Sequence, residues 1–129
     1  MRAISTPGGG TPIFCSGIGK AIVATWEDQQ IDHLIDLYGL TASTAHSLTK
    51  KDTVHAEIAR FRAAGYAIDD EEHVIGLRCV AAVIMGPTGE AIAGLSVSGL
   101  AARMTPDKVA RCAEIVMTTA QEMSGRMEL

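Results

Sequence analysis

Two apolar segments joined by a short turn constrain the fold of this chain more than any other feature. Residues 77–85 are apolar at both alternating sets of positions, as in a strand buried on both faces. A Gly-Pro-Thr-Gly turn at residues 86–89 follows, and residues 91–99 again have the composition of a strand. The sequence therefore predicts an antiparallel hairpin with a four-residue loop, which other elements must cover.

Four helices are predicted around this hairpin. Apolar residues recur at helical spacing over residues 17–24, 27–38, 52–64 and 106–123. Ser16 is a candidate N-cap for the first helix, and Gly39 and Gly65 suit the ends of the second and third. The last helix is predicted to bury the stripe Val109, Ala113, Val116, Ala120 and Met123. With a short strand at residues 66–68, the predicted fold class is α/β, with helices packed on an antiparallel sheet.

Composition excludes several classes of protein. The 129 residues suffice for one domain, and their hydrophobic fraction of 47% suits an ordinary core. A net charge of -4 and a pI near 5.5 argue against direct nucleic-acid binding by this chain. Residues 1–12 do not have the layout of a signal peptide, and no apolar run is long enough for a membrane span. Cys15, Cys79 and Cys112 are widely spaced, so no disulfide framework or zinc site is predicted, and a reducing cytoplasm is expected.

One face of the predicted hairpin carries small polar groups. If Met85 lies opposite Glu90, Cys79 falls opposite Ser96 and Leu77 opposite Ser98, so their side chains share a face. A thiol and two hydroxyls on rigid strands would suit a compact anion or a 2-oxo acid. Alternatively, the two serines face solvent or a helix backbone. A slip of one residue in the turn would separate the cluster.

The segment Ser16-Gly17-Ile18-Gly19 opens the first predicted helix. Unpaired amides at a helix start favour a carboxylate or a phosphate. The spacing fits neither a Walker A loop nor a dinucleotide-binding fingerprint. The alternative interpretation is that both glycines permit close helix packing.

An acidic run at residues 69–72 is followed by His73. Cation binding is one interpretation of the run, but its spacing fits no EF-hand, and a solvated loop is the favoured interpretation. Asp69 lies nearest the sheet and is the member that could turn inward. No matched partner is found for His33, His46 or His55, and no nucleophile with a base can be placed. The sequence therefore predicts no enzyme, no metal site and no cofactor.

Three ordered segments resemble the effector-binding domains of IclR-type bacterial transcription regulators. They are IFCSGIGKA at residues 13–21, GYAIDDEE with GLRCVAA over residues 65–82, and LSVSG with RMT over residues 95–105. The order and separation of the segments match the motifs of that family. The resemblance runs from about Met1 to Ser124, nearly the whole chain.

This resemblance implies a GAF-like α/β fold that binds a small metabolite, often an organic acid. The acidic run with His73, and residues 76–79, are especially similar to the glyoxylate-responsive repressors of allantoin utilisation within the family. Such repressors hold their ligand with an aspartate, a cysteine and two serines, close to backbone amides at a glycine-rich helix start. Carried over by position, the implied ligand-binding residues are Asp69, Cys79, Ser96 and Ser98, with Gly17 and Gly19 nearby and Leu77 lining the pocket.

Family members also carry an N-terminal winged helix-turn-helix, and their effector domain begins before the segment that matches Met1. Residues 1–129 are therefore expected to form one effector-binding domain, incomplete at its N-terminal side and without a DNA-binding domain. The expected function is sensing of a small organic acid or 2-oxo acid, such as glyoxylate or pyruvate. Expected partners are the acid, further copies of the chain in a dimer or tetramer, and DNA only through a winged-helix domain outside this chain.

Two functions of other classes compete with sensing. The chain could be a remnant that binds no ligand and pairs with intact homologues through an open sheet edge. An enzyme ranks last, because no nucleophile with a base is visible.

Overall fold

The computed structural model describes residues 13–126, so the N-terminal segment considered above lies outside the described residues. In chain order the elements are a 3-10 turn η1 (Ile13–Cys15), helices α1 (Gly17–Val23), α2 (Asp28–Tyr38) and α3 (Lys51–Ala64), strands β1 (Ala67–Asp70), β2 (Leu77–Met85) and β3 (Ala91–Leu100), and helix α4 (Pro106–Arg126). The predicted helices and hairpin strands are confirmed, with boundaries that differ by at most three residues. No helix of the described segment is both long and apolar enough to cross a membrane.

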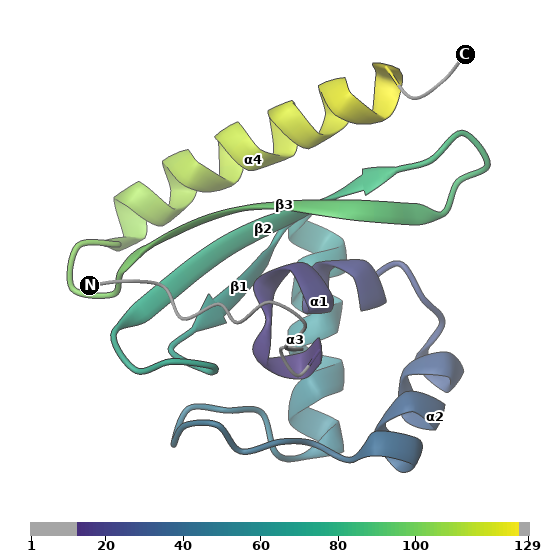
Figure 1. Cartoon of the computed structure of the whole chain (residues 1–129), viewed down its shortest axis with the longest axis vertical. Coiled ribbons are helices and arrows are strands. Elements are labelled where there is room, and N and C mark those ends of the chain that lie inside the picture. Colours follow the sequence, from purple (N-terminus) through teal and green to yellow (C-terminus); the bar gives the residue numbers. More distant parts are fainter. Residues whose placement is uncertain (1–12, 127–129) are drawn as a thin grey trace, which may run out of the picture.

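The three strands form one antiparallel sheet in the order β1-β2-β3. Helix α4 crosses one face of the sheet, whereas α1 and α3 cover the other face (Figure 1). Helix α2 lies outside this second layer and packs against α3. The α/β class with helices on an antiparallel sheet is therefore confirmed.

The register of the hairpin differs from the predicted one by two residues. Cys79 pairs with Ser98, not with Ser96, which pairs with Ala81. The reason lies in the turn, where Glu90 belongs to the loop and its carbonyl accepts a hydrogen bond from the Gly86 amide at 2.7 Å. Met85 therefore pairs with Ala91, and an irregularity between Ile84 and Met85 adds the second residue of the shift. Because side chains alternate with a period of two, this shift leaves every side chain on its predicted face.

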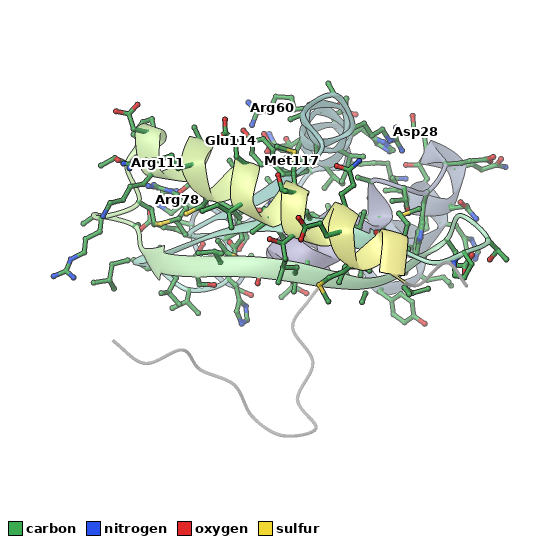
Figure 2. The ribbon with its side chains drawn as sticks, turned by 90° about the horizontal axis from the view of Figure 1, so that it is seen from above. Asp28, Arg60, Arg78, Arg111, Glu114 and Met117 are labelled. Carbon is green, nitrogen blue, oxygen red and sulfur yellow. The ribbon has the colours of Figure 1, made fainter. Side chains whose placement is uncertain are left out.

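Helix α4 buries part of the predicted stripe against the sheet. Ala113, Val116 and Ala120 are buried. They pack against the β2 side chains that face α4, among them Val80. Met123 is 42% exposed, so its predicted place in the core is wrong. The stripe continues instead at the next turn with Ser124, whose hydroxyl accepts the Met85 amide at 2.9 Å and donates to the Ala120 carbonyl. Figure 2 shows Arg111 and Glu114 along the length of α4, and both are exposed.

Side-chain ion pairs join α2 to α3. His55 Nε2 lies 2.6 Å from Asp32 Oδ1, and Lys51 Nζ lies 2.9 Å from Asp36 Oδ1. No partner for His55 was predicted, because a contact between two helices has no local spacing that would reveal it. This cluster holds the outer helix in place, away from the cavity described next.

Candidate functional site

A cavity of about 160 Å³ opens between the start of α1, the turn after β1 and the hairpin. Its lining residues are Ser16, Gly17, Ile18, Asp69, His73, Val74, Leu77, Cys79, Ser96 and Ser98. Every residue carried over from the family resemblance lines this cavity except Gly19. The polar side chains come from four separate segments of the chain, so the fold brings together groups that are remote in sequence.

Close approach of α1 to the sheet forms one wall of the cavity. A Cβ atom on Gly17 would lie 3.2 Å from Cys79 Sγ and 3.4 Å from Ala81 Cβ. Gly17 thus allows the first turn of the helix to pack directly on β2. This close contact agrees with the interpretation that Gly17 permits tight helix packing. It also places the backbone of Gly17 at the cavity.

Gly19 lies behind this wall. A Cβ atom there would be only 2.5 Å from the Ile13 carbonyl oxygen, which is fixed backbone. Its amide donates to Ser16 Oγ at 3.1 Å, which confirms Ser16 as the N-cap of α1. The structure therefore gives Gly19 a packing and capping position, with no contact to the cavity.

Asp69 presents the only acidic side chain among the lining residues. Its Oδ1 accepts a hydrogen bond from the Glu72 amide at 2.9 Å. Burial raises the pKa of Asp69 above its ordinary value of 3.8, against the opposing effects of the Glu72 and His73 backbone amides and of Lys20. The carboxyl group is thus easier to protonate than an exposed aspartate, which lowers its repulsion of an anionic ligand.

The acidic run does not form the solvated loop that was favoured from sequence. Strand β1 continues through Asp70, whose carboxylate pairs with Arg78 Nε at 2.8 Å. Glu71 Oε1 accepts the Gly76 amide at 3.0 Å, so it closes the turn. The strand was predicted to end at Ile68, and its two additional residues place Asp69 opposite Cys79 and Asp70 opposite Arg78. Within residues 13–126 no cluster of histidine, cysteine and acidic side chains suits a metal ion.

Glu72 forms a buried ion pair with Lys20, and sequence reasoning missed it. Lys20 Nζ lies 2.5 Å from Glu72 Oε1 and 2.5 Å from the Ile68 carbonyl oxygen, and the Lys20 side chain is 0% exposed. The Phe61 ring lies under the ammonium group, with its centroid 5.2 Å from Nζ. Burial raises the pKa of Glu72, while the adjacent Lys20 opposes that rise. The available signal was a lysine within the apolar sequence of a short helix.

His73 and Val74 complete the cavity on the side of the β1–β2 turn. Neither was among the residues carried over from the resemblance. His73 Nδ1 is buried and has no hydrogen-bond partner among the described residues. The position of these residues in the sequence could have indicated their place in the cavity. They follow Asp69 closely, so a turn that directs Asp69 inward also brings them near the cavity.

Other hollows among the described residues are larger. A groove of about 450 Å³ along α2 is lined by Trp26, Gln29, Gln30, His33 and Leu34. A cavity of about 230 Å³ beside α3 is lined mostly by apolar and small side chains, with Arg62 at its rim. A cavity of about 240 Å³ is lined by His46, Leu48, Glu57, Arg60, Ile68, Asp70 and Glu72, and its carboxylates already form ion pairs. A site that orients a small ligand typically brings together a few convergent polar groups, and none of these hollows takes polar groups from several strands. The cavity at the start of α1 is therefore the candidate site.

Comparison with known proteins agrees with this fold. The family model for the C-terminal region of the bacterial transcriptional regulator IclR matches residues 1–125. The transcriptional repressor IclR of Escherichia coli K12 is 37% identical over 96% of this chain and 45% of its own length. The repressor AllR of the same strain is 32% identical over 100% of this chain and 48% of its own length.

A solved structure shows the same architecture. The Agobacterium tumefaciens repressor BlcR superposes with a TM-score of 0.88 at 26% identity, covering 92% of this chain and 49% of that chain. The chain thus spans about half the length of the relatives it matches. These relatives are named as repressors, in agreement with the expectation that the chain is not an enzyme. This chain belongs to the family of bacterial transcriptional regulators of the IclR type and corresponds to their C-terminal domain.

Proposed function

We propose that this chain senses a small organic acid, of the size of glyoxylate or pyruvate, in the cavity at the start of α1. In this proposal Asp69, Cys79, Ser96 and Ser98 contact the acid through their side chains, and Leu77 supplies an apolar wall. Gly17 contributes backbone at the first turn of α1. The observation that carries the proposal is the convergence of these groups, from three strands and one helix, on a single cavity.

The volume of the cavity limits the size of the ligand. Drug-sized molecules occupy pockets of roughly 300–1,000 Å³. The cavity holds about 160 Å³, which corresponds to roughly five water molecules at liquid density. An acid with a few heavy atoms fits this space, and its oxygens find a thiol and hydroxyls as partners. A nucleotide or an aromatic ligand would require the walls to separate.

In the context of a whole regulator, the acid would act at a distance. Binding would shift the balance between assemblies of the protein and so change the affinity of DNA-binding domains that lie outside this chain. We infer that the chain works as a dimer or tetramer in the cytoplasm, where an operator-binding regulator acts. The named repressor relatives support this proposal.

Thermal unfolding with and without millimolar glyoxylate, pyruvate and acetate tests the sensing function. A native ligand raises the melting temperature with concentration, following the linkage relation. Ser96→Ala should abolish the rise and leave the melting temperature without ligand nearly unchanged. Thr118→Ala deletes a hydroxyl on an exposed position of α4 and serves as the matched control. A rise that persists in Ser96→Ala would place the ligand elsewhere.

A second candidate function is pairing with other copies without any ligand. It is favoured by the sheet, in which β1 and β3 each have one edge unpaired within residues 13–126. Unpaired edges offer backbone groups to another strand. Light scattering on the purified chain distinguishes the two: a dimer or tetramer that no acid stabilises supports pairing alone.

A further inference from the structure

His73 lines the cavity, and its buried ring nitrogen Nδ1 has no hydrogen-bond partner among the described residues. The residue follows Glu72 in the turn between β1 and β2. A buried polar atom without a hydrogen-bond partner destabilises the folded state. A buried nitrogen of this kind therefore needs an explanation, such as a ligand that supplies the partner.

The charged groups around His73 show what is missing from the cavity. Asp69 faces it from β1, and Cys79 faces the cavity from β2. The serines of β3 carry no charge. Lys20 of α1 and Glu72 neutralise each other behind the wall, because Lys20 Nζ already contacts Glu72 Oε1 and the Ile68 carbonyl oxygen. Among the described lining residues, His73 is therefore the only side chain able to carry a positive charge.

An organic acid would add a second carboxylate to a cavity that already contains Asp69. Two carboxylates in one partly buried site repel each other unless a proton or a cation enters with them. Burial already raises the pKa of Asp69, which shows that the cavity disfavours even one negative charge. Histidine is the side chain whose charge ordinarily changes near neutral pH.

We propose that His73 balances the charge of the ligand: its protonated ring donates a hydrogen bond to the carboxylate of the bound acid, so the acid enters together with a proton from solvent. This inference rests on the proposed function and adds its pH dependence. The proton goes to the imidazole ring, the ligand stays a carboxylate, and no covalent bond changes. The χ2 torsion of histidine is broad and close to two-fold, so rotation of the ring can turn a nitrogen toward the cavity.

Titration calorimetry of the 129-residue chain with glyoxylate and with pyruvate tests this assignment. Runs in phosphate and in Tris at one pH give the number of protons taken up, since the two buffers differ in their heat of ionisation. The wild-type chain should take up a proton on binding, and its affinity should fall by up to about tenfold per pH unit above neutrality. His73→Gln keeps a hydrogen-bonding group without the charge, and should bind at least about tenfold more weakly with no proton uptake.

Two further variants sharpen the test. His33→Gln, on an exposed position of α2, should behave as the wild type. Asp69→Asn separates the two proton carriers: uptake that vanishes there but persists in His73→Gln would overturn the assignment to His73. His73→Asn provides a second variant if the glutamine side chain disturbs folding, which cooperative unfolding reveals.

The outcomes also separate this inference from the function on which it rests. Binding by the wild type that is independent of pH, or a His73→Gln chain that binds as tightly as the wild type, overturns the role of His73 and leaves acid sensing standing. No binding of either acid by the wild-type chain overturns both.

Discussion

Lys20 Nζ and Glu72 Oε1 lie 2.5 Å apart, with side chains that are 0% and 6% exposed. The pair joins α1 to the turn after β1, and both of these segments line the candidate cavity. Glu72 Oε2 also accepts a hydrogen bond from the Asp70 amide at 2.8 Å. The backbone amide of Glu72 donates to Asp69 Oδ1. One buried ion pair therefore fixes the two cavity walls relative to each other.

Breaking this pair should destabilise the protein strongly. Lys20→Met leaves Glu72 charged and unpaired in the interior, and removal of one partner of a buried pair costs about 3–5 kcal/mol. Urea unfolding should show this loss of free energy. Lys51→Met removes an ammonium from an exposed pair with Asp36 and should change the free energy of unfolding far less, because solvent screens an exposed pair. Equal effects of the two substitutions would contradict the role of the buried pair.

The stability of the protein should depend on the charge state of Asp69. Burial raises the pKa of this carboxyl in the folded protein above its ordinary value of 3.8. The folded state then binds the proton more tightly than the unfolded state, so stability falls as pH rises from 3.8 through the folded pKa. Asp69→Asn removes this loss and should raise the melting temperature at pH 7.

The gain in Asp69→Asn should vanish below pH 3.8, where the aspartate is protonated in both states. Melting curves from pH 3 to pH 8 measure the difference. Glu114→Gln, on an exposed position of α4, is the control. A variant that is less stable than wild type at pH 7 would show that the carboxylate is needed to hold the turn.

Gly94 should not tolerate a side chain. A Cβ atom there would lie 2.4 Å from Cγ2 of Ile18, which itself lines the cavity. Gly94→Ala should therefore push α1 away from β3 and cost about 1–3 kcal/mol in urea unfolding. Ile18→Ala removes the side chain that collides, so Gly94→Ala and Ile18→Ala together should cost less than the sum of their separate effects. Gly125→Ala, in α4 with no heavy atom within 4 Å, should instead stabilise by about 0.5–1 kcal/mol.

Arg78 should anchor the start of α4. Its guanidinium donates to Asp70 at 2.8 Å and to the carbonyl oxygens of Ala101 and Met104 at 3.0 and 2.7 Å. Arg78→Leu leaves these two carbonyls without their donor and should lower the free energy of unfolding by about 1–3 kcal/mol. Arg111→Leu, on the exposed side of α4, should change it little (Figure 2). If Arg78→Leu left the free energy of unfolding unchanged, water would have to replace the guanidinium as the donor to these carbonyls.

The sequence predicted the cavity side of the hairpin although it misplaced the register. Cys79 was paired with Ser96, whereas the structure pairs it with Ser98. The error was two residues: the loop holds Glu90, so Met85 pairs with Ala91, and the irregularity between Ile84 and Met85 adds the second residue. An even shift preserves the alternation of side chains, so the thiol and both hydroxyls still share a face. An odd shift would have dispersed them.

Contacts between remote segments could not be predicted in this way. Nothing in the local pattern pairs Lys20 with Glu72, because the two residues meet only when α1 packs across the end of β1. The same packing turns the acidic run inward and gives Asp69 its place in the cavity. Met123 fits the helical period of α4, but the period does not reveal where the sheet beneath the helix ends.

The residues that line the cavity lie far apart in the sequence, with Gly17 at the start of α1 and Ser98 in β3. Contacts of such wide sequence separation form late in folding, after the loop-closure entropy has been overcome. An acid that binds there acts as a removable cross-link between α1 and the hairpin. Any partial unfolding that detaches α1 releases the acid, so occupancy should slow amide hydrogen exchange throughout the domain and not only beside the ligand.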